Sequence, residues 1–330
     1  MRQAYHVPAK QGMMSTDATV WSSAMGYAVF VGDVALDEYY TADYWPTIKD
    51  KAIVRALPAV PGGMIANAAS VAAALGMQVK FLAMLNRGAI TQVLLDDLQH
   101  RGIDTSLVIF DDTLPDAKCM IFLVQDEHTV IIPTMGITHI EITPAQLEVL
   151  AHADVIYSTP VEFDVLRCGE MDHMAIRAYC RAHGAQLVFD LDVDYFKDGD
   201  ETRYQHLDVV FFNEVGFDSY RGELSMQAAA NRLLAYGIAV VVVTQAAQGC
   251  MVYTPAQTQH VPGFAVDVVD VTGAGDTFGG SFVYARAMGK NLADAARFAN
   301  ATAAICVGGL GARAGAVARH VVEARIAYGG

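Results

Sequence analysis

The stretch DVVDVTGAGDTFGGSF, from Asp267 to Phe282, carries most of the information about this chain. It starts as an apolar, β-branched run and breaks at Thr272-Gly273-Ala274-Gly275. It then opens an apolar helix with Asp276 in its first turn. Small residues let an anion approach the free N–H groups of a helix N-terminus. Such a cradle for negative charge beside a carboxylate suggests phosphoryl transfer to a substrate hydroxyl.

Other interpretations of these glycines fit less well. A dinucleotide-binding turn belongs after the first strand of a βαβ unit, whereas Gly273–Gly279 and Gly309–Ala314 lie near the C-terminal end of the sequence. No GxxxxGK[ST] loop occurs, which argues against a P-loop nucleotide kinase. Glycines that serve helix packing alone would leave Asp276, an acid between two glycine pairs, unexplained.

Composition narrows the class of protein. The 330 residues are 53% hydrophobic and 18% charged, which fits one large α/β domain with a sizeable core. No apolar run is long enough to span a membrane, and the net charge of −14 argues against nucleic-acid or anionic-membrane partners. Five scattered cysteines without a CxxC pair predict reduced thiols in a cytoplasmic protein. Residues 1–26 lack an apolar signal core and are expected to form a disordered tail.

Strand and helix patterns alternate along most of the chain. Strands are expected at 27–34, 79–85, 155–157, 187–190, 209–212 and 239–244. This alternation predicts a three-layer α/β/α domain over 27–330 with a mostly parallel sheet, and with functional residues at the carboxyl ends of its strands. The segments 37–61 and 118–133 interrupt the pattern. The second is a hairpin candidate, and together the two are expected to form a small β lid.

Polar residues at the first predicted strand and helix are candidates for a binding site. Asp37 follows the first strand, where its carboxylate could accept hydrogen bonds from a polyol or could form an ordinary turn. Gly62-Gly63 opens a helix that carries Asn67. Two glycines permit close approach of a ligand to N–H groups. Tight helix packing would explain the alanines of this helix but not Asn67.

Two later strands also end in polar residues. Asp190 and Asp192 are expected to face the site from the end of one strand. Asn213 and Glu214 follow the very apolar strand at 209–212, either as site residues or as an ordinary helix cap.

With these pieces in order, the chain resembles the PfkB/ribokinase family of carbohydrate and nucleoside kinases over about residues 27–325. The resemblance rests on Gly62-Gly63…Asn67 early and on the segment from Asp270 to Phe278 late. It implies that Asp276 is the base that deprotonates the substrate hydroxyl. It also implies that the N–H groups of Gly273, Ala274 and Gly275 form an anion hole for the γ-phosphoryl group of ATP. We further expect the helix dipole to keep Asp276 ionised.

The resemblance assigns roles to further residues. Positions Asp37, Gly63 and Asn67 are expected to hold sugar hydroxyls, and Asp270 and Thr272 to help hold a monovalent cation, K⁺. The β lid often forms a dimer clasp in this family. The nucleotide site is expected to include Asn213, Thr244, Gly249, Asn300 and Ala304.

The chain departs from the family pattern at three places. The usual Asn-x-x-Glu becomes Asn213…Gly216, so that magnesium is expected to bind through water or Glu214. The usual Gly-Asp-Asp becomes Asn86-Arg87-Gly88, and Arg87 either faces an acidic substrate group or, the favoured alternative, pairs with a surface acid. Ala246 replaces a usual glycine.

The predicted function is therefore the ATP- and Mg²⁺-dependent phosphorylation of a hydroxymethyl group on a sugar-like molecule by a cytoplasmic homodimer. The tail Gly311–Gly315 resembles those of sugar-acid and sulfosugar kinases as much as that of ribokinase. A nucleoside kinase is an alternative, with lid aromatics such as Tyr44 and Trp45 holding the base. A second alternative is a catalytically weak sugar-binding regulatory protein of the same fold, which Asp270 and Asp276 argue against.

Overall fold

Short apolar runs form the central sheet of the computed structural model, which describes residues 26–125, 127–192 and 201–329. The predicted tail therefore lies outside the described residues, apart from Gly26. The strand order is β17 (Thr258–Val261), β16 (Cys250–Tyr253), β15 (Val240–Thr244), β14 (Val209–Asn213), β13 (Gln186–Asp190), β11 (Val155–Ser158), β1 (Ala28–Val31) and β5 (Val79–Leu82). From β15 to β5 neighbouring strands are parallel, whereas β16 and β17 are antiparallel. The parallel strands are apolar because both of their faces are buried.

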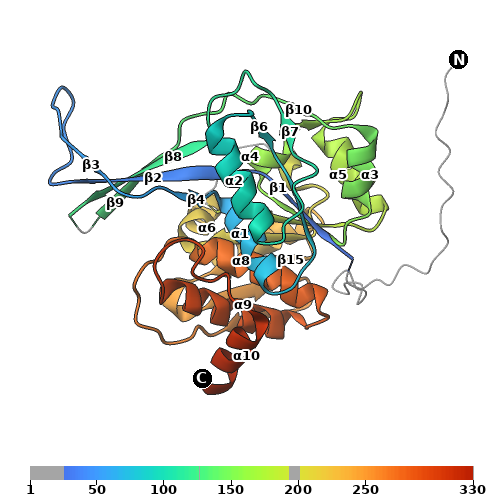
Figure 1. The fold of residues 1–330 in the computed structure, drawn as a ribbon. Coiled ribbons are helices and arrows are strands. Elements are labelled where there is room, and N and C mark those ends of the chain that lie inside the picture. Colours follow the sequence, from blue (N-terminus) through green and yellow to red (C-terminus); the bar gives the residue numbers. More distant parts are fainter. Residues whose placement is uncertain (1–25, 126, 193–200, 330) are drawn as a thin grey trace, which may run out of the picture.

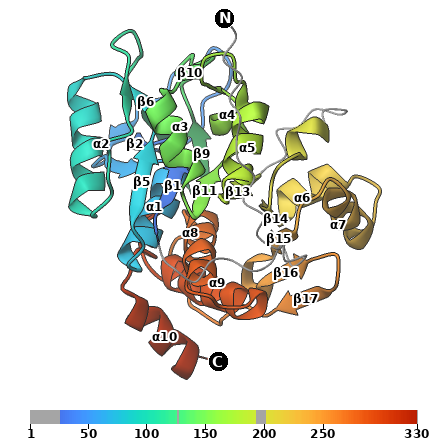
Figure 2. The same ribbon diagram turned by 90° about the vertical axis from the view of Figure 1, so that its right-hand side faces the viewer.

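Helices cover both faces of this sheet, which confirms the predicted three layers (Figures 1 and 2). One face packs against α1 (Met64–Ala74), α2 (Ala89–His100), α8 (Ala274–Ala287), α9 (Leu292–Val307) and α10 (Arg319–Tyr328). The other packs against α3 (Pro144–Ala151), the short α4 (Pro160–Phe163), α5 (His173–Ala182), α6 (Glu214–Arg221) and α7 (Met226–Ala235). Each face buries its own hydrophobic cluster, since alternate side chains of a strand point to opposite sides.

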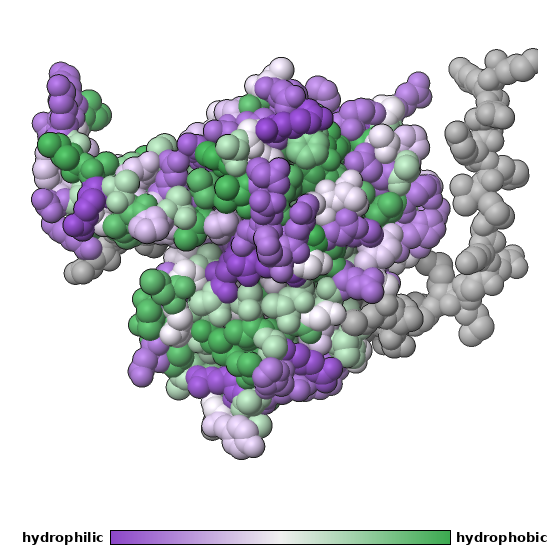
Figure 3. All heavy atoms as spheres, viewed as in Figure 1, coloured by the Kyte–Doolittle hydropathy of each residue, from purple (hydrophilic) through white to green (hydrophobic). Residues whose placement is uncertain are grey.

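A small sheet projects from the body of the molecule (Figures 1 and 3). Its order is β3 (Arg55–Ala56), β2 (Ala35–Ala42), β8 (Lys118–Val124) and β9 (Glu127–Ile131), and β4 (Val60–Gly62) also pairs with β2. Strands β8 and β9 form the predicted hairpin. Hydrophobic side chains are exposed along this sheet and its loops, Ile48 and Ile53 almost completely.

One apolar run and one predicted strand differ in the structure from what their residues suggest. The β-branched run from Val266 to Val271 forms no strand, and three of its valines are about 60% exposed. The predicted strand 79–85 divides into β5 and β6 (Met84–Leu85), of which β6 pairs with β7 (Ile109–Phe110) in a separate sheet. A further two-stranded sheet joins β10 (Ile140–Glu141) to β12 (Leu166–Arg167). Among the described residues, no helix has the length and apolar character needed to cross a membrane.

Candidate active site and nucleotide pocket

The start of α8 presents free N–H groups beside an acid, although they are not all the groups expected from the sequence. Gly273 precedes the helix with a φ of 76°, and a Cβ there would lie 2.2 Å from the carbonyl oxygen of Ala312, so only glycine fits. The N–H of Ala274 donates to Val271 O at 3.2 Å. Those of Gly275 and Asp276 have no hydrogen-bond partner among the described residues, as expected for a first helical turn.

Glycines inside α8 bring a second helix against Asp276. A Cβ at Gly280 would lie 2.3 Å from the carbonyl oxygen of Ala68 in α1, so the bare glycine lets the two helices touch. As a result, Asn67 of α1 reaches Asp276, and its Nδ2 donates to Asp276 Oδ2 at 2.9 Å. The last glycines of the opening sequence therefore assemble two of the candidate site residues.

A buried arginine that the sequence did not single out completes this cluster. Arg313 Nε donates to Asn67 Oδ1 at 2.8 Å, and one terminal nitrogen donates to Gly62 O at 3.2 Å. The other forms an ion pair with Asp97 of α2. Since a guanidinium only donates, the amide oxygen of Asn67 must face Arg313 and the amide nitrogen must face Asp276.

The acidity of Asp276 differs from the expectation. Burial raises its pKa well above the ordinary value, and the charges of Asp190, Asp33 and Asp192 raise it further. The hydrogen bond from Asn67 acts in the opposite direction. Burial and the neighbouring acids therefore oppose the ionisation of Asp276 that the helix dipole was expected to favour.

Asp37 lies on β2, pressed against the Gly62-Gly63 turn. A Cβ at Gly62 would lie 2.0 Å from Asp37 Oδ2, so the glycine makes room for this carboxyl. Asp37 is buried, and desolvation together with the charge of Asp33 raises its pKa to about 6. Asp33, which the sequence did not mark as a site residue, accepts N–H groups of Met64 and Ile65 at 2.9 Å and so caps α1.

A largely apolar cavity of about 550 Å³ lies on the other side of the α8 start. Four of the predicted nucleotide-binding residues line it, namely Thr244, Gly249, Asn300 and Ala304. Ala274 and Gly275 line it too, so the cavity reaches the first turn of α8. The exposed valines 268 and 271 belong to the same wall.

The family comparison fits this geometry. The pfkB family carbohydrate kinase profile matches residues 25–319. The chain belongs to the pfkB family of carbohydrate kinases. Its members transfer a phosphoryl group to an alcohol, and the chain is accordingly a phosphotransferase of this type.

Individual relatives agree with this assignment. The kinase is 26% identical to a ribokinase of Bacillus subtilis over 89% of its own length and 97% of the relative's. It is 27% identical to fructokinase-2 of Zea mays over 74% and 79% of the two chains. Its fold is similar to that of an Arabidopsis thaliana ribokinase solved with ribose and ATP, with a TM-score of 0.80, 21% identity and coverage of 92% and 100%.

Within the kinase, Asn300 and Gly249 shape the wall of the 550 Å³ cavity. Asn300 Nδ2 donates to the carbonyl oxygens of Val261 and Pro262 at 3.0 and 3.1 Å, so its side chain ties the end of β17 to α9. A Cβ at Gly249 would lie 2.1 Å from Val261 O. Ala246, which stands where the family commonly has glycine, adopts a left-handed φ of 47°. This conformation strains an alanine.

Three other predicted residues lie in different surroundings. Arg87 pairs with Asp112 at 2.9 Å and is 61% exposed, which agrees with the favoured surface pairing rather than with a substrate contact. Asn213 caps α6 by accepting Gly216 N at 2.7 Å, while its Nδ2 donates to Asp192. Glu214 is exposed on the first turn of α6.

Asp270 joins the two loops beneath the α8 start. Its carboxylate accepts the N–H groups of Thr272 and Gly311, each at 2.9 Å. Asp190, at the end of β13, accepts the hydroxyl of Tyr157 at 3.0 Å, and its pKa is raised to about 6 by burial and by Asp192. In the part of the chain that the structure describes, no group of three His, Cys, Asp or Glu side chains is arranged to hold a metal ion.

Proposed function

We propose that this kinase transfers the γ-phosphoryl group of ATP to a hydroxymethyl group of a sugar-like acceptor, with Asp276 as general base. One observation carries the proposal: the first turn of α8 lies between two sites. Ala274 and Gly275 line the 550 Å³ cavity, which we assign to the nucleotide, whereas Asp276 does not line this cavity and contacts Asn67 of α1. Phosphoryl transfer needs such positioning of donor and acceptor more than covalent chemistry.

The chemistry follows from this placement. The free N–H groups of Gly275 and Asp276 would stabilise negative charge on the transferring group. Asp276 in its ionised form accepts the hydroxyl proton, and its raised pKa makes it a stronger base than an ordinary aspartate. Asp37, Gly63 and Asn67 would hold acceptor hydroxyls in front of it.

Magnesium fits the carboxyl ends of β13 and β14. Asp190 and Asp192 would supply the oxygen ligands that Mg²⁺ prefers. Burial and then the charge of Asp192 raise the pKa of Asp190, and a bound cation would relieve the repulsion between the two acids. We propose that these two acids, with Asn213, hold hydrated Mg²⁺, which neutralises phosphate charge when bound. Glu214, which was expected from the sequence to take part in binding magnesium, is exposed, and its position gives this role little support.

Three further features remain proposals. Asp270 and Thr272 would support K⁺ beside the anion hole, because the Asp270 carboxylate already organises that loop. The exposed apolar side chains of the small sheet support a lid that also forms a homodimer contact. The five free, buried cysteines are compatible with the predicted cytoplasmic location.

The decisive experiment measures ATP consumption over a panel of sugars, sugar acids and nucleosides. We expect turnover of at least one sugar, with higher rates in K⁺ than in tetramethylammonium at equal ionic strength. Preferential turnover of a nucleoside would favour the nucleoside-kinase alternative. Sugar binding without any turnover would replace the proposal with the regulatory one.

A further inference from the structure

A buried tyrosine that the sequence did not mark as a site residue lies between Asp190 and α8. Tyr157 belongs to β11, and its side chain is fully buried. Its hydroxyl donates to Asp190 Oδ2 at 3.0 Å. A Cβ at Gly279 of α8 would lie 2.1 Å from the same hydroxyl oxygen, so the bare glycine lets the helix rest on it. One hydroxyl therefore contacts both Asp190 and the helix that carries Asp276.

The two acids proposed to hold magnesium belong to a series of hydrogen bonds that begins at Tyr157. Asp190 Oδ1 accepts Asp192 N at 3.0 Å, and Asp192 Oδ1 in turn accepts Asn213 Nδ2. The backbone at Asp192 has a φ of 36°, which residues other than glycine seldom adopt and which surrounding contacts must maintain. Among the described residues, only Tyr157 donates to Asp190 Oδ2. The tyrosine therefore fixes the oxygen that the rest of the series leaves free.

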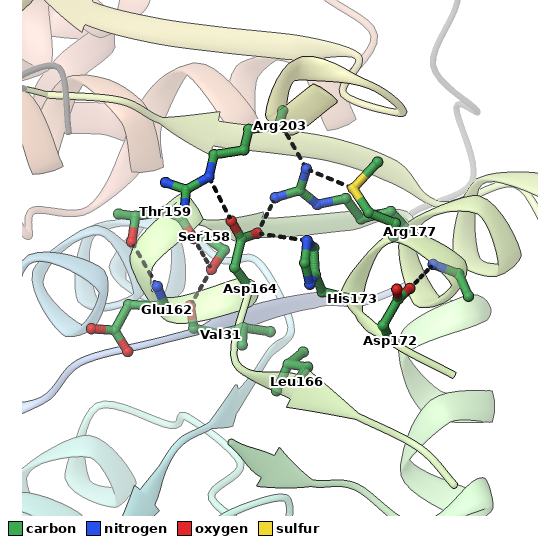
Figure 4. Close-up of polar contacts among 12 residues, drawn as sticks. Val31, Ser158, Thr159, Glu162, Asp164, Leu166, Asp172, His173, Arg177 and Arg203 are labelled. Carbon is green, nitrogen blue, oxygen red and sulfur yellow. Dashed lines mark hydrogen bonds and ion pairs between the residues drawn. The ribbon is translucent and has the colours of Figure 1, made fainter. Parts of the chain in front are cut away.

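The strand end that carries Tyr157 is itself held in place (Figure 4). Ser158 Oγ donates to Val31 O at 2.6 Å, which ties the last residue of β11 to β1. Thr159 then caps α4 by accepting Glu162 N at 3.2 Å, so the chain turns directly into a helix. The backbone from which the tyrosine ring extends is therefore anchored next to the point where the hydroxyl is needed.

We propose that Tyr157 is a positioning residue for phosphoryl transfer, whose hydroxyl holds the Asp190 carboxylate in place for Mg²⁺ and at a fixed separation from the base, Asp276. This inference rests on the proposed kinase function and on its roles for these two acids. The acids are close enough to interact, because after burial the charge of Asp190 is the largest neighbouring charge that raises the pKa of Asp276. Groups that hold a metal ligand from behind fix its orientation and tune its affinity.

Packing of the core does not require the hydroxyl of Tyr157. The centroid of its ring lies 5.2 Å from that of Phe30 and 6.3 Å from that of Phe211, and a phenylalanine would keep both contacts. A buried hydroxyl costs free energy unless it finds a partner, and its partner here is a carboxylate. A tyrosine at this position therefore acts on Asp190 rather than on the core.

The test replaces Tyr157 with phenylalanine and measures metal binding directly. Mn²⁺ takes the place of Mg²⁺ in the presence of the hydrolysis-resistant ATP analogue AMP-PNP, and electron paramagnetic resonance reports the free ion. The kcat and the KM for the sugar are measured in parallel with Mg²⁺ and ATP. The matched control is Tyr253→Phe, because Tyr253 is also buried, packs on Phe217 and has no hydrogen bond from its hydroxyl to a described residue.

We expect Tyr157→Phe to weaken Mn²⁺ binding about 10–100-fold and to lower kcat, while the KM for the sugar stays within about twofold of the wild-type value. Tyr253→Phe should leave all three quantities unchanged. Added to Asp190→Asn, Tyr157→Phe should cause no further loss of Mn²⁺ affinity, because the hydroxyl acts through that carboxylate.

A wild-type Mn²⁺ affinity in Tyr157→Phe overturns the inference, even if the variant is less stable than the wild type. Additive losses in the double variant overturn it as well. Either result leaves the kinase proposal standing if the wild-type protein phosphorylates a sugar. Weakened Mn²⁺ binding in a protein that phosphorylates none of the acceptors supports the role of Tyr157 at the metal and overturns the kinase proposal alone.

Discussion

Replacing Arg313 with methionine should slow catalysis while leaving substrates able to bind. Arg313 Nε donates to Asn67 Oδ1 at 2.8 Å, and Asn67 Nδ2 donates to Asp276 Oδ2 at 2.9 Å. Methionine keeps most of the apolar stem but removes every donor. The Asn67 amide then loses the contact that fixes its orientation, and Asp276 loses a donor that opposes the rise in its pKa.

The magnitude follows from burial. The Arg313 side chain is 8% exposed, so water does not replace its contacts. A hydrogen bond to a charged group contributes about 1.5–3 kcal/mol, which corresponds to a fall in kcat of about 10–100-fold. The free energy of unfolding should fall by only about 1–3 kcal/mol. The reason is that Asp97 keeps a second arginine, Arg101, at 3.1 Å.

Steady-state kinetics across pH measures this effect, and the structure provides a matched control. Arg101→Met removes the second arginine that pairs with Asp97, and no contact between Arg101 and Asn67 is lost with it. Arg313→Met should lower kcat more than it raises KM and move the acidic limb of the kcat profile to higher pH. Combined with Asn67→Ala it should add nothing further. The reasoning would be refuted if Arg313→Met kept the wild-type kcat and the wild-type acidic limb of the pH profile. It would also be refuted if the losses of kcat in the two single variants were additive in the double variant.

Four other outcomes are expected. Asp276→Asn should lower kcat by about 10²–10⁴-fold, while its affinity for ATP, measured by calorimetry, should be retained. Unchanged turnover in this variant would contradict the role of Asp276 as base. Gly280→Ala should push α1 away from α8, and should therefore lower the free energy of unfolding by about 1–3 kcal/mol and also reduce kcat. A loss of stability with an unchanged kcat would contradict the idea that this helix contact positions Asn67 against Asp276. Ala246→Gly should raise stability by about 0.5–1 kcal/mol in denaturant titrations, since φ is 47° there. The pKa of Glu162 in the folded protein, about 8, exceeds that in the unfolded chain, so its contribution to stability is lost as pH rises through 8. Glu162→Gln should therefore have the higher Tm at pH 9, and a wild-type Tm there would count against burial of this acid.

Local glycine patterns made part of the site predictable. Glycines mark the starts of α1 and α8 in the sequence. The structure gives the reason, because a Cβ at Gly62 or at Gly273 would clash with a neighbouring group. The sequence alone left open whether Asn213 is a site residue or a helix cap. In the structure Asn213 caps α6 and also contacts Asp192.

Tertiary contacts determine what the sequence could not reveal. Arg313 sits among small residues that look like a surface loop, yet a fold that brings α1 and α2 beside it buries its side chain. The raised pKa of Asp276 arises from burial and then from the charges of Asp190, Asp33 and Asp192, which come from the ends of β13 and β1 and the residues after them, whereas the dipole argument considered only its own helix. Glu162 lies on the short helix α4, four residues after the end of β11, which is close to the edge where the rule for carboxyl ends of parallel strands places functional residues.

The contacts around Asn67 also concern how the chain folds. Its hydrogen bond to Asp276 closes a loop of 209 residues, and its bond to Arg313 spans 246. Each closure costs chain entropy, and the contacts that offset this cost form only when both ends of the domain are in place. The site therefore assembles after the C-terminal helices have docked on α1. Fraying of those helices, which costs less than global unfolding, would separate the base from its partners while most of the sheet stays folded.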